Sequence, residues 1–158
     1  MAVPTRATVI QAVFGIIYDR ISTDVTSVTL SDATTSTIQT YTGAFPDSEI
    51  DTKSSYPICI VNSPEVIWED FTFTRKYVNG EFTIDIYTTK AEAADLFLDA
   101  IIESIETYKG TLKNTDKMSF VNLISTDSDS VMRGNSMKVH IRSVTFGFKF
   151  PFTKSAGT

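Results

Sequence analysis

Cysteine and histidine are almost absent from this sequence of 158 residues, which has one of each, Cys59 and His140. A single cysteine excludes an internal disulfide, and together the two residues are too few for a zinc site built from Cys and His. Uninterrupted apolar runs are only a few residues long, which excludes a membrane-spanning helix. The seven glycines are scattered, so no glycine-rich phosphate loop is present, and the N-terminus lacks the build of a secretion signal.

Serine and threonine are abundant instead, with 16 Ser and 23 Thr, and 11 Phe and six Tyr supply large core groups. Threonine and aromatic residues favour strands, whereas serine favours turns. The length suits a single domain, which we expect to cover residues 1–158 and to be rich in β-structure.

The net charge of −5 is unevenly distributed. Residues 131–158 contain five basic residues and no acid, so all 19 acidic residues lie in residues 1–130. One interpretation is a basic strand that packs beside its own acidic sheet. The other is head-to-tail association, in which a basic edge meets an acidic edge of the next copy. Nucleic-acid binding is less favoured because the overall negative charge repels phosphate.

The first long pattern is helical. Apolar residues recur at helical spacing between positions 9 and 21, so we expect a helix over residues 4–21 that docks onto a sheet. A polar arm is expected over residues 22–55, because 12 of the 21 positions from Ser22 to Thr42 are Ser or Thr. Val25–Leu30 and Thr37–Tyr41 could pair there as a hairpin. A partner-binding arm is favoured over a mobile loop.

An apolar strand is expected over Tyr56–Asn62, with Cys59 as a small buried residue. Asn79-Gly80 then lies between two alternating segments, and this dipeptide is the strongest short-range indication of a type I′ hairpin. The predicted turn gives one apolar face, made of Phe71, Phe73, Tyr77, Phe82, Ile84 and Ile86. Arg75 is the misfit, which snorkels from the core rim or, as the less favoured alternative, pairs with another subunit.

A second helix is predicted over residues 89–109. Thr89 and Glu92 have the spacing of a capping box, and Gly110 is a fitting C-terminal stop. After it we expect a strand over Met118–Ser125, an acidic loop over 126–130 and a long strand over Met137–Phe150. The apolar alternation of that last strand changes phase near Arg142, which suggests a bulge, and Pro151 is expected to end it.

These elements predict an α+β fold: a two-layer domain with a mainly antiparallel sheet, two helices packed on one face and a long polar arm or hairpin. The other face of the sheet is expected to be polar and able to meet water, a lumen or a neighbour.

Candidate catalytic groups are sparse. Asp47, Asp51 and Lys53 resemble the acidic and lysine set of a metal-dependent nuclease, but they stand in one polar loop rather than on adjoining strands. Asp127 and Asp129 lack the glycine and the terminal glutamate of a calcium loop. His140 is expected to be solvated or interfacial, and Trp68 to lie in the core or at its rim. We therefore predict no enzyme, cofactor or metal site.

The segment Tyr56-Pro-Ile-Cys-Ile-Val61, with Phe82-Thr-Ile-Asp-Ile-Tyr87 running into Thr89-Lys-Ala-Glu-Ala-Ala-Asp95, resembles the tail terminator (tail completion) proteins of long-tailed bacteriophages and related minor head–tail joining proteins. The resemblance covers residues 56–109, and the arm over 22–55 has no fixed counterpart in it.

That resemblance implies a structural virion protein, made in the host cytoplasm, that forms a ring, commonly a hexamer. The ring would cap the head-proximal end of the tail tube, stop tube growth and present a surface to the head connector or completion protein. DNA would pass through its lumen without specific binding, and no membrane would be involved. The expected subunit interface comprises Arg75, Arg133, Lys138 and Arg142. The expected lumen-facing or partner-facing residues are Asp47, Glu49, Asp127 and Asp129.

Two alternatives stay open at this point. A metal-dependent nuclease or other small hydrolase would depend on Asp47 or Asp51. A monomeric adhesion or ligand-binding module would bind its ligand near Tyr41 and Trp68.

Overall fold

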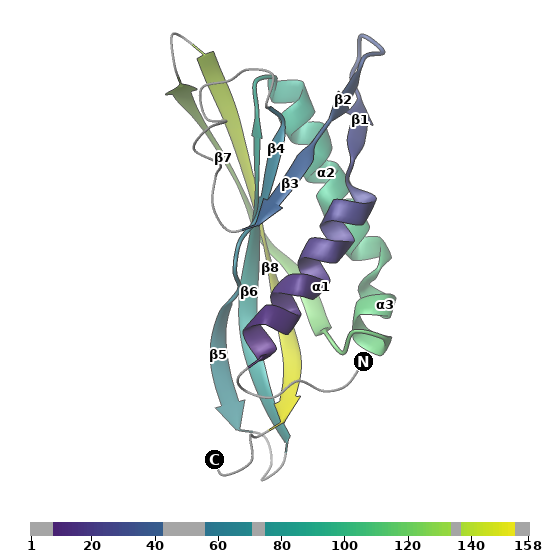
Figure 1. Ribbon diagram of the computed structural model, residues 1–158, viewed down its shortest axis with the longest axis vertical. Coiled ribbons are helices and arrows are strands. Elements are labelled where there is room, and N and C mark those ends of the chain that lie inside the picture. Colours follow the sequence, from purple (N-terminus) through teal and green to yellow (C-terminus); the bar gives the residue numbers. More distant parts are fainter. Residues whose placement is uncertain (1–7, 43–55, 71–74, 134–136, 154–158) are drawn as a thin grey trace.

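Half of the fold is a long, twisted sheet, and helices cover one of its faces (Figure 1). The computed structural model describes residues 8–42, 56–70, 75–133 and 137–153. The helices are α1 (Val9–Asp24), α2 (Ala91–Thr107) and α3 (Lys109–Asn114). The strands are β1 (Ser27–Thr29), β2 (Thr35–Thr37), β3 (Gln39–Thr42), β4 (Ile58–Val61), β5 (Glu65–Asp70), β6 (Arg75–Thr88), β7 (Ser119–Arg133) and β8 (Met137–Thr153). The predicted α+β class with helices on a mainly antiparallel sheet is confirmed.

The main sheet has the strand order β3-β4-β6-β8-β7. β5 pairs with the first part of β6, next to β4, so β4 and β5 follow one another along the same strand. All pairings are antiparallel except that of β3 with β4. β6 and β8 pair over 14 consecutive positions and form the spine of the molecule.

The predicted hairpin at Asn79-Gly80 is wrong, because β6 runs straight through this dipeptide. Partners on both sides hold it extended: Gly80 lies opposite Val66 on β5 and Phe148 on β8. Glycine is required there for space rather than for a turn, since a Cβ would come within 2.5 Å of the Glu65 carbonyl oxygen. The continuous strand also moves Tyr77 off the predicted apolar face, to the side opposite that of Phe82.

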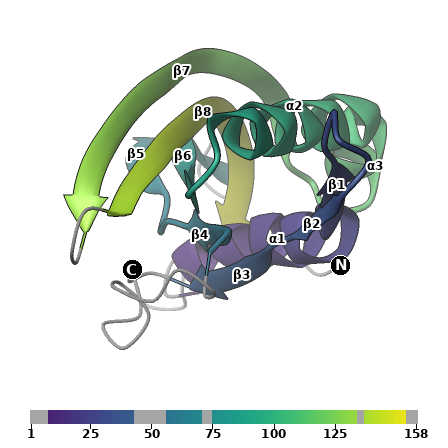
Figure 2. The same ribbon diagram turned by 90° about the horizontal axis from the view of Figure 1, so that it is seen from above.

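The core lies between the sheet and the helices. Figure 2 shows α1 and α2 side by side within the curve of the sheet, with β7 as its outermost arc. Helix α2 buries Phe97, Ile101 and Ile105 completely, and the rings of Phe82 and Phe146 stack in the sheet at 5.4 Å between centroids. The described helices cover this face as expected.

The predicted ends of the second helix are wrong. Lys90 stands at the N-cap position without a side-chain capping bond, and α2 begins at Ala91. Instead of closing a capping box, the Glu92 carboxylate accepts hydrogen bonds from the Ser31 backbone N–H at 2.7 Å and hydroxyl at 3.1 Å. Gly110 does not end the helical segment, because it lies inside α3.

The predicted projecting arm is wrong for residues 22–42. Helix α1 continues to Asp24, and a hairpin forms as the pair β1–β2, in register from Ser27–Thr37 to Thr29–Thr35. Its second strand is not the predicted Thr37–Tyr41, because Gln39–Thr42 pairs with β4. Val25, Leu30 and Ile38 are buried in the main core, which ties the segment down. Sparse but well-spaced apolar residues therefore outweigh the polar composition. The rest of the arm, residues 43–55, lies outside the described residues.

The predicted acidic loop over 126–130 is also wrong, because these residues belong to β7 and pair with β8. Long pairing with β8 overrides the loop preference of Ser and Asp. The register shifts that occur lie in β7, between Ser119 and Asn122 and between Leu123 and Ser125.

No bulge is present in β8 near Arg142, where the pairing with β6 is regular. The change of phase has another cause: β8 buries residues on both sheet faces. Val144 and Phe146 face the helices, whereas Val139 joins a second cluster with Tyr56, Ile58 and Ile60. The second sheet face is therefore partly apolar, not polar throughout as expected. β8 also continues past Pro151 to Thr153, beyond the end of its pairing with β7.

Candidate protein–protein interface

The basic residues predicted at a subunit interface have separate positions. Arg142 is tied to its own chain, because its Nε donates to the Asp95 carboxylate on α2 at 2.7 Å. Lys138 is exposed on β8, and Arg133 is partly exposed near the end of β7. Arg75 begins β6, but its side chain lies outside the described residues. These four residues are not brought together as one patch.

The acidic residues predicted to face a lumen or partner differ as well. Asp127 and Asp129 are exposed on β7, the strand at one end of the sheet. Their carboxylates accept hydrogen bonds from the next backbone N–H, at 2.8 Å for Ser128 and 2.7 Å for Ser130. Asp47 and Glu49 lie outside the described residues. The register also places β7 beside the basic strand β8 of the same chain, as the first charge interpretation expected.

Large apolar side chains are exposed at both edges of the sheet in the part where β5 pairs with β6. The β5 patch consists of Ile67, 71% exposed, and Trp68, 39% exposed. The β7 patch consists of Phe120, 78% exposed, together with Leu123 and Ile124. At this level the strand order is β5-β6-β8-β7, so the two patches lie on opposite edges. Exposed apolar patches of this kind are typical of protein-binding surfaces.

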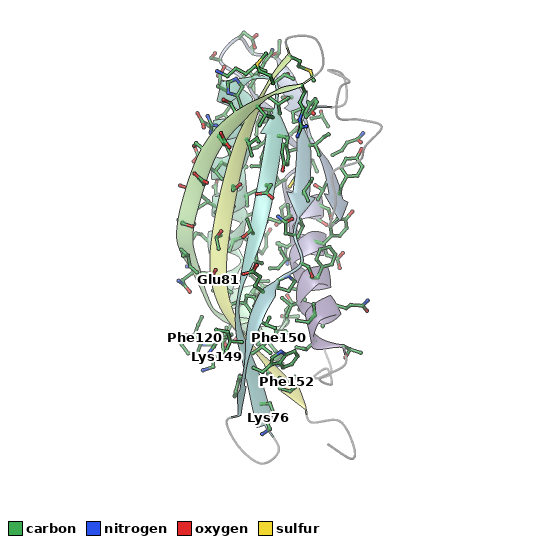
Figure 3. All side chains as sticks on the ribbon, turned by 90° about the vertical axis from the view of Figure 1, so that its left-hand side faces the viewer. Lys76, Glu81, Phe120, Lys149, Phe150 and Phe152 are labelled. Carbon is green, nitrogen blue, oxygen red and sulfur yellow. The ribbon has the colours of Figure 1, made fainter. Side chains whose placement is uncertain are left out.

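A furrow joins the two patches across the sheet face that turns away from the helices. It is made of two hollows, of 350 and 440 Å³, which share Asn79, Gly80 and Glu81. Ile67 lines the hollow beside β5 and Phe120 lines the one beside β7. Figure 3 shows Phe120 near Lys149 in this part of the molecule, with Glu81 just above. The surface is thus an apolar rim around a polar floor.

The backbone of Phe120 has an unusual conformation, with φ of 54°. Bulky residues rarely adopt positive φ, and such strain is kept where the surrounding structure needs it. Phe120 lies in the irregular start of β7, next to its first register shift. The backbone there turns an aromatic ring into solvent.

Sequence reasoning singled out Trp68, expected in the core or at its rim and found 39% exposed, but missed Ile67 and the whole β7 patch. Ile67 and Phe120 stand in short apolar runs that look like ordinary strand residues, and the predicted hairpin assigned β5 no partner on β6. Only the true strand order shows that β5 and β7 are edge strands. The one available signal was the pair Leu123-Ile124, whose neighbours in sequence cannot both face one core.

In the part of the chain that the structure describes, no group of three or more His, Cys, Asp or Glu residues could hold a metal ion. Burial raises the pKa of the Cys59 thiol to about 12, so the thiol stays protonated. Burial, together with the positive charges of Lys138 and Arg142, lowers the pKa of His140. Asp47, Asp51 and Lys53 lie outside the described residues.

Tyr41 and Trp68, the pair expected in a ligand-binding module, are far apart. Tyr41 pairs with Ile60 on β4, which in turn pairs with Asp85 on β6. Trp68 pairs with Val78 on the same strand β6. Seven strand positions separate Val78 from Asp85, which corresponds to about 24 Å. The two aromatic residues do not form one site.

None of the helices that the structure describes is both long and apolar enough to cross a bilayer. No protein-family model matches the sequence. No curated protein matches it either.

Proposed function

We propose that this chain is a structural subunit that assembles head to tail into a closed ring, as in the tail terminator proteins that its sequence resembles. In that role the ring caps the head-proximal end of a phage tail tube, stops its growth and offers a surface to the head connector, while DNA passes through the lumen. The observation that carries the proposal is the placement of two exposed apolar patches on opposite edges of the same sheet.

Opposite edges favour a particular symmetry. A two-fold dimer buries the same patch of both copies, whereas a head-to-tail contact buries two different patches and repeats until the ring closes. The β5 patch and the β7 patch are different surfaces on opposite edges of the sheet. The β5 patch of one copy can therefore cover the β7 patch of the next.

Burial of the two patches contributes part of the free energy of association. Ile67 and Phe120 are 71% and 78% exposed, and full burial of each such side chain contributes about 1.5–3 kcal/mol. The positive φ of Phe120 holds its ring outward before any partner arrives, which lowers the cost of ordering it on binding.

A mixing experiment tests the head-to-tail arrangement. Ile67→Asp places a charge in the β5 patch and Phe120→Asp places one in the β7 patch. Aspartate tolerates positive φ better than most residues, so the second change adds little strain. Ala91, exposed at the start of α2 and outside both patches, gives the control Ala91→Asp.

We expect neither patch variant alone to form a ring, or any species larger than a dimer, by light scattering, and Ala91→Asp to assemble in the same way as wild type. A mixture of the two patch variants retains one intact interface and should give a one-to-one heterodimer. A mixture without this heterodimer, or patch variants that still form rings, would overturn the proposal.

A further inference from the structure

We infer that the end of β7 is a second self-association site, at which the free edges of two copies pair antiparallel about a two-fold axis at Val131. This inference goes beyond the ring and depends on different residues. β7 is 15 residues long, is the last strand of the sheet and is exposed from Asn122 to Ser130. Native proteins rarely leave so long an edge uncovered, because it templates pairing with another strand.

The free edge is identified by two backbone amides. Ser128 and Ser130 are two residues apart, so their N–H groups point to the same side of the strand. Each N–H donates to the carboxylate of the preceding aspartate, at 2.8 and 2.7 Å. We take this side to be the one away from β8, since amides on the other side serve the ladder. In a single copy, the carboxylates therefore satisfy these edge amides and occupy them, so that they are not open to other strands.

Charge selects the partner and the register. Asp127, Asp129, Val131 and Arg133 alternate along β7 and share one face of the sheet. With the axis at Val131, Arg133 of a second copy lies directly opposite Asp129 and diagonal to Asp127, and the two Val131 side chains face each other. A register moved by one position, with its axis at Ser130, also places Asp127 opposite Arg133, but it brings the two Asp129 carboxylates diagonal to each other, which repels.

Pairing exchanges one set of hydrogen bonds for another. Asp129 releases the Ser130 N–H and turns to the guanidinium of the second copy, while Ser130 and Met132 of opposite copies exchange backbone hydrogen bonds. Met132, 62% exposed in one copy, becomes partly covered. No polar group loses a partner in the exchange, so the Asp127 and Asp129 carboxylates do not prevent this pairing. They disfavour pairing with an acidic strand, because like charges repel.

Cross-linking tests the axis directly. Cys59 is fully buried, so an introduced cysteine is the reactive thiol. Val131→Cys places two thiols on directly opposite residues, whose Cα atoms are about 4.5–5.5 Å apart, within disulfide range. Ser125→Cys is the control: it lies on the same strand face, but the two copies of residue 125 are about 40 Å apart in this register.

We expect mild oxidation to convert Val131→Cys to a covalent dimer at least about ten times faster than Ser125→Cys. Equal rates for the two variants would overturn the inference. Circular dichroism of both variants confirms that they fold before the comparison is made.

A charge exchange tests the register independently of cross-linking. Asp129→Arg and Arg133→Asp should each weaken β7 pairing about tenfold, and the double variant should recover most of that loss. These measurements use the Phe120→Asp background, in which the proposed ring contact is absent. If the ring proposal is wrong, the charge exchange can still be measured in this background. If the double variant does not recover pairing, the Val131 register is wrong, but the ring proposal is unaffected.

Discussion

Gly80 offers a quantitative test of the extended path of β6. The residue is flanked by β5 and β8, and a Cβ at this position would lie 2.5 Å from the Glu65 carbonyl oxygen and 2.8 Å from Cζ of Phe148. The first contact is with backbone and cannot be relieved by a side-chain rotation, so β5 has to move. Overpacking of this kind costs about 1–3 kcal/mol, and we expect Gly80→Ala to lose about 2 kcal/mol. At this chain length that loss lowers Tm by about 5 °C.

Two further variants make the result specific. Gly15 lies inside α1, and a Cβ there would meet nothing within 4 Å, so Gly15→Ala should gain about 0.5–1 kcal/mol. Asn79→Thr distinguishes a strand from a turn, since threonine suits a strand but not the positive φ of a type I′ turn. Urea unfolding followed by circular dichroism measures all three. A Gly80→Ala protein as stable as wild type, or a loss above about 1 kcal/mol for Asn79→Thr, would refute the continuous strand.

Three other predictions concern titration, reactivity and charge. Burial and nearby positive charges lower the pKa of His140, so the unfolded chain binds this proton more readily than the folded chain does. The free energy of unfolding should therefore fall as the pH drops through 6.5. His140→Gln should make this pH dependence weaker in urea titrations between about pH 7.5 and 5.5. Cys59, with its pKa raised to about 12, should resist a thiol reagent in the folded protein and react fully in urea; rapid labelling without denaturant would contradict its burial. Asp95→Asn breaks the contact with Arg142 at a site where Asp95 is 64% exposed, so thermal unfolding should show a loss below about 1 kcal/mol, and a loss of several would assign the pair a larger role.

The class of the fold could be predicted because its main signals are local. The helical stripe with Phe97, Ile101 and Ile105 and the alternation of Phe146, Phe148 and Phe150 each determine a buried face without knowledge of the partner. These residues are buried as expected.

The path of the chain could not be predicted where long-range pairing outweighs local preference. Asn79-Gly80 has the local signature of a turn, and residues 126–130 that of a loop, yet both lie in strands because β8 pairs with them over many residues. The candidate interface depends on the same long-range information. Ile67 and Phe120 become significant only once β5 and β7 are known to be edge strands.

The mass of the assembly, measured by native mass spectrometry over a range of protein concentrations, tests the central claim most directly. The account predicts one closed species whose mass is a fixed multiple of the 17.5 kDa chain, or twice that multiple where two rings join through β7. A monomer at every concentration, or an open series of growing masses, would contradict it.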